Sequence, residues 1–292
     1  MRLHVVDGTF ELFRAHFAPR PPRQSPLGQD VKATAGVLSS LLALVADRAE
    51  QVTHLAVAFD NPIRSFRNDL FHGYKTDEGV PPELLAQFDL VEEGVRALGI
   101  TVWSMRAHEA DDALASAAAR FQDSVDQVRI LTPDKDLNQC LRGQRVVQVD
   151  RMRRKVLDEE GLMALRGLRP RSVPDFLALV GDDADGVPGL PGFGAVSAST
   201  LLGHYHHIEA IPDHAHQWAV KPRGALQLAS TLAARRQEAL FYRTLTTLME
   251  DAPISSSLDE LGLGALHLDE LERFCQRIGV RELMAQAAVV RA

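Results

Sequence analysis

Carboxylate side chains follow three short apolar stretches of this chain. The stretches lead to Asp7, to Asp60 and, through Thr132-Pro133, to Asp134. Short runs rich in Val, Ile and Leu are typical of buried strands, and helical patterns separate these three, so their order predicts a parallel sheet. The carboxyl ends of parallel strands lie along one edge of a sheet, where open α/β sheets bind ligands. Three aspartates at that edge would repel one another, which indicates that a cation lies between them.

Six further carboxylates extend this acidic set. They occur at the start of an Ala-rich helix, just beyond Asp134, and in a Gly-Asp-Asp-Ala-Asp-Gly segment: Glu109, Asp111, Asp112, Asp136, Asp182 and Asp185. Two carboxylates about 4 Å apart repel by roughly 4 kcal/mol at an effective dielectric near 20. Hard divalent cations offset that repulsion and prefer carboxylate oxygen. No Cys or His belongs to the set, so Mg²⁺ or Mn²⁺ fits it better than zinc or copper.

Each acidic segment also has a purely structural interpretation. Acidic residues in the first turn of a helix are stabilised by the helix dipole and need bind nothing. A single aspartate after a strand commonly caps a turn or a helix. Because five separate segments would all have to be caps, we favour a divalent-metal site.

Composition limits the classes of protein that fit. A length of 292 residues corresponds to one or two domains, and the two cysteines, Cys140 and Cys275, provide no disulfide framework. No apolar run approaches the about 18 residues of a membrane span, and the chain enters a strand without a signal-peptide pattern, so we expect a cytoplasmic protein. The formal net charge of −7 disfavours indiscriminate binding to polyanions, so contacts with nucleic acid would be local and assisted by metal.

An alternating series of strands and helices positions the acidic residues in the first half of the chain. Strands are expected near 2–6, 53–59, 100–104, 127–132 and 145–149, with helices at 31–49, 82–98 and 109–121. This order predicts an α/β fold with a mostly parallel central sheet and flanking helices. From about residue 195 onward the pattern is helical, with a break near Asp251-Ala-Pro253.

A Gly- and Pro-rich element joins two predicted helices, 173–180 and 195–205. It contains Gly189, Gly192 and Gly194, but the third glycine of a dinucleotide fingerprint is missing and its prolines exclude a regular strand before it. We interpret the element as a helix–hairpin–helix whose glycines let backbone N–H groups approach a phosphate or a monovalent cation such as K⁺. A tight structural turn is the alternative.

Taken in order, the motifs resemble those of the 5′-nuclease, or flap-endonuclease-like, superfamily. They are most similar to the bacterial branch, which comprises the N-terminal nuclease domain of DNA polymerase I and stand-alone 5′→3′ exonucleases. The resemblance covers about residues 1–250 and includes Asp7-Gly-Thr, Ala58-Phe-Asp60, Tyr74-Lys75, Glu109-Ala-Asp-Asp112, Thr132-Pro-Asp-Lys-Asp-Leu137, Gly181-Asp-Asp-Ala-Asp185 and Gly189-Leu-Pro-Gly-Phe-Gly194. It implies a PIN-like α/β domain over 1–170 with a helical arch at about 71–93. A helical extension over 171–292 would hold the helix–hairpin–helix at about 173–205.

The resemblance also implies roles for single residues. Two divalent ions, Mg²⁺ or Mn²⁺, would be held by nine carboxylates: Asp7, Asp60, Glu109, Asp111, Asp112, Asp134, Asp136, Asp182 and Asp185. Catalytic roles are implied for all of these except Asp112 and Asp185. Lys75 would reach the scissile phosphate and stabilise charge in the transition state. Contacts to DNA are implied for Lys75 and for six further residues: Arg14, Arg64, Arg67, Gly189, Gly192 and Gly194.

Three positions depart from the pattern that is usual in bacterial relatives. Glu78 stands where an arginine is common, Val196 where a lysine is usual, and Gly186 where an asparagine is common. The predicted arch also carries more acidic than basic side chains, and an acidic arch would resist a single-stranded 5′ tail. These differences affect flap threading and duplex affinity, whereas the implied metal ligands are all present.

These observations predict a metal-dependent enzyme that hydrolyses DNA phosphodiesters at 5′ flaps, nicks and 5′ ends. It would act as a monomer in DNA replication or repair, without a membrane partner. Three alternatives stay open: a structure-specific DNA-binding protein with weak or vestigial catalysis, a PIN-type ribonuclease, and a small-molecule phosphohydrolase. The first would explain Glu78 and Val196 but leaves the complete carboxylate set without a use. The other two give no reason for the helix–hairpin–helix.

Overall fold

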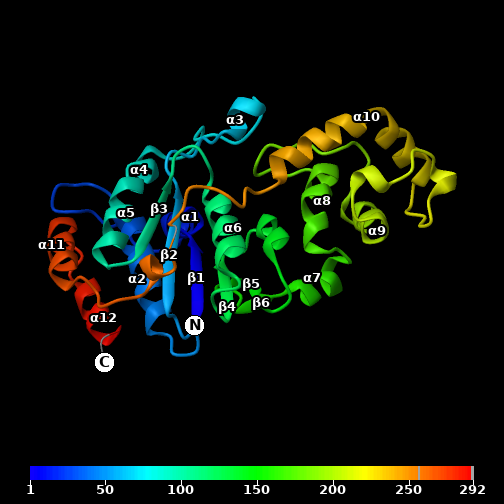
Figure 1. Cartoon of the computed structure of the whole chain (residues 1–292). Coiled ribbons are helices and arrows are strands. Elements are labelled where there is room, and N and C mark those ends of the chain that lie inside the picture. The colour runs from blue at the N-terminus through cyan, green and yellow to red at the C-terminus, as the bar shows by residue number, and fades with distance from the viewer. Residues whose placement is uncertain (256, 291–292) are drawn as a thin grey trace. The chain divides into compact units, whose positions relative to one another are not determined.

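The protein folds as two compact units, which Figure 1 shows within one ribbon. The computed structural model describes residues 1–255 and 257–290. Unit 1 contains Met1–Ile63, Asp77–Thr132 and Glu250–Ala292, and unit 2 contains Arg64–Thr76 and Pro133–Met249. None of the helices in the described residues is both long enough and apolar enough to cross a membrane.

A parallel sheet forms the centre of unit 1. Its strands are β1 (Arg2–Asp7), β2 (His54–Asp60), β3 (Thr101–Met105) and β4 (Gln127–Leu131), in the order β3-β2-β1-β4. Asp7 pairs with Ala58 and Asp60 with Met105, so the carboxyl ends of these strands lie at one edge. The inner strands are apolar on both faces, as is expected where helices cover a parallel sheet on both sides.

Helices cover both faces of this sheet, with α2 and α5 on one side and α6 on the other (Figure 1). The helices of unit 1 are α1 (Gly8–Phe17), α2 (Lys32–Ala46), α4 (Pro82–Leu85), α5 (Phe88–Ala97), α6 (Ala110–Phe121), α11 (Leu268–Ile278) and α12 (Glu282–Val290). The helix expected over 82–98 is divided into α4 and α5. At the division the buried Gln87 side chain accepts hydrogen bonds from Thr34 N and Oγ1, at 3.0 and 3.1 Å.

Unit 2 is mainly helical. It contains α3 (Arg67–Leu70), α7 (Glu159–Arg166), α8 (Val173–Val180), α9 (Ala195–Tyr205), α10 (Ala225–Thr246) and an antiparallel hairpin of β5 (Val146–Asp150) and β6 (Lys155–Leu157). The helices α8 and α9 have the bounds expected for the helix–hairpin–helix. Their buried leucines, such as Leu177 and Leu201, form one core with Leu232 of α10. The predicted α/β architecture with a mostly parallel sheet and this helical extension is confirmed.

Unit 1 combines three separate segments of the chain, including its last part, Glu250–Ala292. The last helices, α11 and α12, pack on α5 and α2 of unit 1. Gly94 on α5 makes this packing possible, because a Cβ there would lie 2.9 Å from the Phe274 ring. Such long-range contacts between helices leave no local mark in a sequence pattern. The segment 71–93, where an arch was expected, has no helix before α4, and Phe88 at the beginning of α5 is buried in unit 1.

A buried histidine lies in the middle of the sheet of unit 1. His4 on β1 is fully buried, and its Nε2 lies 3.0 Å from Glu50 Oε2. Arg129 on β4 pairs with the same carboxylate at 2.9 Å. Burial lowers the pKa of His4 from 6.5 to about 4, although the neighbouring Glu50 opposes the shift. The folded protein therefore keeps this imidazole neutral near neutral pH.

Replacing His4 with glutamine should reduce the loss of stability in acid. The imidazole binds its proton near pH 6.5 in the unfolded chain but near pH 4 in the folded protein, so stability is lost as the pH falls between these values. Wild type should lose about 2 kcal/mol more than His4→Gln between about pH 7.5 and 4.5. Urea unfolding at both pH values measures this difference. The change of the exposed His72 to glutamine is the control, and equal losses in wild type and His4→Gln would refute the assignment.

Candidate metal centre and nucleic-acid interface

Asp7 and Asp60 are the last residues of the neighbouring strands β1 and β2, and both are largely buried. Asp7 Oδ1 accepts a hydrogen bond from Phe10 N at 2.8 Å, and its Oδ2 accepts one from Thr132 Oγ1 at 3.0 Å. Asp60 Oδ1 accepts a hydrogen bond from Ala110 N, the first residue of α6, at 2.6 Å. The two carboxylates are therefore held in fixed orientations at one edge of the sheet, as the strand pattern predicted.

The acidic residues that open α6 form a cap. Glu109 is the N-cap residue, and a capping box links it to Asp112, whose Oδ2 accepts a hydrogen bond from Glu109 N at 3.0 Å. Both side chains are buried, and Asp111 is half-buried. The structural interpretation of this segment is thus correct as far as the cap is concerned. The Ala110 N–H also brings the start of α6 against Asp60, so the capped end of α6 and Asp60 lie side by side.

A second acidic group lies in unit 2 and consists of Asp136, Asp182 and Asp185, the aspartate cluster hereafter. One carboxylate oxygen from each residue lies within 4.8 Å of the others. Asp136 belongs to a 3₁₀ helix, η1 (Lys135–Cys140), and Asp134 caps it by accepting from Asp136 N at 2.9 Å. The structure brings these three of the predicted ligands together within one unit.

The loop that carries Asp182 and Asp185 is held by its backbone. Asp182 and Val187 exchange two hydrogen bonds, of 2.7 and 2.8 Å, and Asp182 Oδ1 accepts one from Ala184 N at 3.1 Å. Gly186 has a φ of +74°, and a Cβ on it would lie 2.2 Å from Gly73 O. Only glycine fits this close approach, so the loop and the segment before Lys75 can come together.

Two lysines contact the aspartate cluster. Lys75 Nζ lies 2.9 Å from Asp185 Oδ1, and Tyr74 donates its hydroxyl proton to Asp185 Oδ2 at 3.2 Å. Lys135 Nζ lies 2.5 Å from Asp182 Oδ2. The resemblance pointed to Lys75 but not to Lys135. The sequence feature that could have identified Lys135 is its position between the two predicted ligands Asp134 and Asp136.

Burial and mutual repulsion disfavour the ionised form of the carboxyl groups in and beside the cluster. Burial raises the pKa of Asp136 well above its usual value, and the negative charges of Asp134, Asp185 and Asp182 raise it further. Burial and the charge of Asp185 also raise the pKa of Asp134, although the hydrogen bond from Asp136 N opposes this. A cation placed among these groups would reverse the repulsion.

The donor set of the cluster fits a hard divalent cation. It offers carboxylate oxygens only, which suits Mg²⁺ or Mn²⁺. Asp136 is 4% exposed, and its Oδ1 is a buried oxygen without a hydrogen-bond partner in the structure. Buried acceptors normally have a partner, so an oxygen of this kind beside two other carboxylates has the character of a ligand atom.

Arg67 differs from the phosphate contact that was expected. Its side chain is fully buried in unit 2. Its Nε donates to Leu245 O at 2.8 Å and its Nη2 donates to Thr247 O at 3.0 Å, and these carbonyls belong to the end of α10. A buried guanidinium that satisfies carbonyl groups is structural, so we correct its role from binding to stabilisation. Sequence alone could not distinguish the two roles, because both require a cation.

The other expected arginines differ in exposure. Arg14 is half-buried and pairs with the buried Glu11 within α1. Arg64 is exposed and stays a predicted phosphate contact.

The hairpin glycines have separate structural reasons. Gly189 has a φ of +68°, and a Cβ on it would lie 2.5 Å from the backbone at the end of α8, so it serves packing. Gly192 also has a positive φ, whereas Gly194 is the exposed N-cap residue of α9 with open space around it. Gly194 N donates to Ser197 Oγ at 3.0 Å, so an anion here would be bound by other N–H groups in the first turn of α9. Val196, in the first turn of α9, is 82% exposed and adds no positive charge to this surface.

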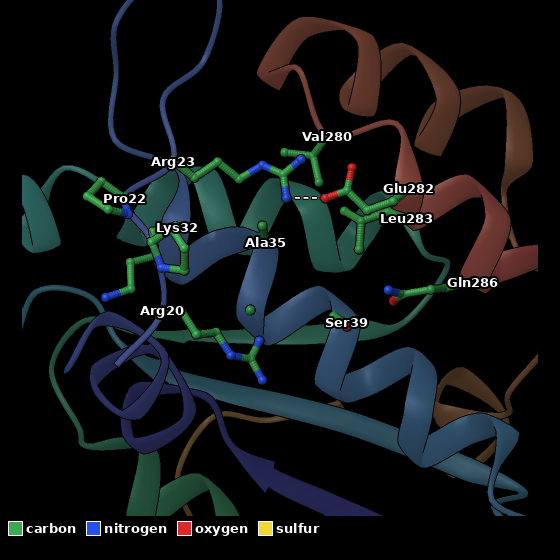
Figure 2. Close-up of a pocket in the computed structure, with 12 residues that line it drawn as sticks. Arg20, Pro22, Arg23, Lys32, Ala35, Ser39, Val280, Glu282, Leu283 and Gln286 are labelled. Atoms are coloured by element: carbon green, nitrogen blue, oxygen red, sulfur yellow. Dashed lines mark ion pairs between the residues drawn. The ribbon is translucent and has the colours of Figure 1, made fainter. Parts of the chain in front are cut away.

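A cavity of about 420 Å³ in unit 1 involves none of the predicted site residues. The loop before α2, α2 itself and the start of α12 line it, as Figure 2 shows. Arg23 pairs with Glu282 across it. Lys32 donates to the carbonyl oxygens of His16 and Ala18 at 2.7 and 2.8 Å. Arg23 thus joins the loop to α12 and Lys32 joins α2 to the end of α1, which gives both cations a structural use.

Comparison with known proteins places the chain in a family. Residues 2–166 match the family described as "5′-3′ exonuclease, N-terminal resolvase-like domain", and residues 168–269 match "5′-3′ exonuclease, C-terminal SAM fold". The 5′-3′ exonuclease of Aquifex aeolicus is 30% identical over 285 residues, which cover 97% of this chain and 94% of the relative. DNA polymerase I of Rhizobium leguminosarum is 34% identical over 267 residues, which cover 89% of this chain. The matched region spans about a quarter (26%) of that polymerase.

Solved structures agree on the fold. T5 5′-exonuclease with bound zinc superposes with a TM-score of 0.65 at 16% identity, covering 98% of this chain and all of that one. The catalytic core of Rad2 in complex with DNA substrate gives 0.63 at 16% identity and covers 99% of this chain and 91% of that one. With both parts of the chain matched, this protein belongs to the 5′–3′ exonuclease family, the family of nucleases that its motifs resemble.

Proposed function

We propose that this chain hydrolyses DNA phosphodiesters at 5′ ends and at junctions between a 5′ single strand and duplex, by a two-metal-ion mechanism. The observation that carries the proposal is the aspartate cluster of Asp136, Asp182 and Asp185, with Lys75 on one of its carboxylates. We assign Mg²⁺ or Mn²⁺ to it and expect a monomer in the cytoplasm. The relatives named above, a 5′-3′ exonuclease and proteins seen with DNA or metal ions, support the substrate class.

Two groups of carboxylates would bind the two ions. In unit 2 the aspartate cluster would hold one ion, with Asp134 beside it. In unit 1 the carboxylates Asp7, Asp60, Glu109 and Asp111 would hold the other, with Asp112 orienting Glu109. Divalent ions in such sites lower the pKa of attacking water and stabilise charge on the phosphate and the leaving oxygen. Lys75, already placed against Asp185, would supply a further positive charge to the phosphate.

Residues other than the carboxylates would bind the DNA backbone. The exposed Arg64 can neutralise a phosphate, and the N-terminus of α9 can bind a backbone phosphate. If K⁺ binds at the hairpin, carbonyl oxygens of the loop that contains Gly192 and Gly194 would be its ligands. A structure-specific DNA-binding protein with weak catalysis is the second candidate. The observation in its favour is the absence of positive charge at two surface positions, Glu78 and the largely exposed Val196.

A cleavage assay separates these functions. The protein is incubated with 5′-labelled flap, nicked and single-stranded DNA, with and without Mn²⁺, and the products are resolved by length. Metal-dependent release of the 5′ strand is the expected result. Binding of flap DNA without cleavage at any metal concentration would support the second candidate, and cleavage confined to an RNA version of the substrates would indicate a ribonuclease.

Asp136→Asn should stabilise the metal-free protein and remove its response to metal. The raised pKa of Asp136 means that folding disfavours its ionised form, so the neutral amide should increase the free energy of unfolding near neutral pH. Wild type should gain about 2.7 kcal/mol at a Mn²⁺ concentration 100 times the dissociation constant, and the variant much less. Urea unfolding in EDTA and in Mn²⁺ measures both effects. Asp183→Asn, an exposed change in the same loop, is the control, and a variant that keeps the full Mn²⁺ gain would exclude Asp136 as a ligand.

Glu78→Arg should strengthen binding of 5′-flap DNA. The change replaces an exposed negative charge with a positive one in a segment expected to meet the 5′ tail. A gain of about three- to tenfold in affinity at low salt is expected, with a steeper salt dependence by about one phosphate contact. Fluorescence anisotropy in Ca²⁺ at several salt concentrations measures both. Glu272→Arg makes the same charge change on α11, and equal gains from the two variants would show a general effect of net charge.

A further inference from the structure

Lys135 lies against two carboxylates of the aspartate cluster. Its Nζ lies 2.5 Å from Asp182 Oδ2 and 3.9 Å from Asp136 Oδ1. The second of these oxygens is the buried acceptor without a hydrogen-bond partner. One ammonium group thus contacts two of the three carboxylates that offer oxygens to a metal ion.

The two lysines at the cluster contact different parts of it. Lys75 pairs with Asp185, whereas Lys135 pairs with Asp182 and approaches Asp136. Lys75 is additionally held in place by a hydrogen bond from its backbone N–H to Asp185 O, at 3.1 Å. Lys135 is the first residue of η1, and its side chain is 38% exposed. Its ammonium group can therefore move from the cluster into solvent.

An ammonium group and a divalent ion compete for this position. Both need the same carboxylate oxygens, and their positive charges repel one another strongly at such separations. A lysine is well suited to yield, since its charge is a compact group on a flexible four-carbon chain. The competition lowers the affinity of the cluster for the ion, while in the metal-free protein the same ammonium offsets the repulsion among buried carboxylates.

We propose that Lys135 is a positioning residue that serves as a tethered counter-ion: it occupies the cation position between Asp136 and Asp182 until a divalent ion displaces it. The proposal rests on the function proposed above only in taking the cluster as an ion site. Lys135 therefore sets the affinity of the cluster for a divalent ion in the absence of DNA. When no ion is bound, its charge stabilises the folded arrangement of the carboxylates.

Manganese binding to the DNA-free protein tests this role directly. Bound Mn²⁺ is counted by the loss of the electron paramagnetic resonance signal of the free ion. Lys135→Met, which keeps the aliphatic chain and removes the charge, should bind the cluster ion about tenfold more tightly because the repulsion is gone. Its melting temperature in EDTA should fall below that of wild type. Lys135→Arg keeps the charge and should retain an affinity close to wild type.

Two comparisons make the test specific. Lys221→Met removes an exposed lysine elsewhere in unit 2 and should leave Mn²⁺ affinity unchanged. Asp136→Asn should weaken the binding that Lys135→Met strengthens. An affinity of Lys135→Met equal to or weaker than that of wild type overturns the proposal, and so does an equal gain in Lys221→Met. Circular dichroism establishes that each variant is folded, and Lys135→Gln replaces Lys135→Met if the latter is not.

The outcome is separable from that of the nuclease assay. Tighter Mn²⁺ binding by Lys135→Met in a protein that cleaves no nucleic acid supports the counter-ion and contradicts the nuclease. Cleavage with an unchanged Mn²⁺ affinity in Lys135→Met contradicts the counter-ion alone.

Discussion

Repulsion among closely spaced carboxylates is the constraint that organises the acidic site of unit 2. In unit 2, oxygens of Asp136, Asp182 and Asp185 lie within 4.8 Å of one another. Each pair at such a distance costs several kcal/mol unless opposite charge is near. The chain supplies that charge from its own lysines, one beside Asp136 in the sequence and one from a distant segment. In the role proposed for Lys135, that lysine gives way to a divalent ion bound by the same carboxylates.

In unit 1, neutral donors hold the acidic side chains at the edge of the sheet. Asp7 and Asp60 accept hydrogen bonds from backbone N–H groups at the starts of α1 and α6, where the helix dipole favours negative charge. Capping and metal ligation are often treated as alternative explanations of an acidic residue. Here a cap fixes the orientation of each carboxylate, and fixed orientation is also what a metal ligand needs. The hydrogen bonds that explain these residues structurally also give their carboxylates the fixed orientation that the proposed metal binding needs.

The parts of the fold that the sequence predicts are those set by local pattern. The strands that end at Asp7 and Asp60 follow from apolar runs, and the helices α8 and α9 follow from periodicity and the glycines between them. The parts that it does not predict depend on distant contacts. Packing of α11 and α12 on unit 1 is one example, and the burial of Arg67 against the end of α10 is another. In each case a polar or apolar residue has several possible partners, and only the tertiary structure selects one.

The positions that depart from the family pattern differ in their structural effect. Glu78 and Val196 are exposed, so they alter surface charge without altering the fold. Gly186 is different, because its missing Cβ leaves room for Gly73 O. An asparagine would tolerate the positive φ but not the contact. The glycine thereby allows the segment of Tyr74 and Lys75 to lie against Asp185, so this departure helps to place the lysine at the acidic loop.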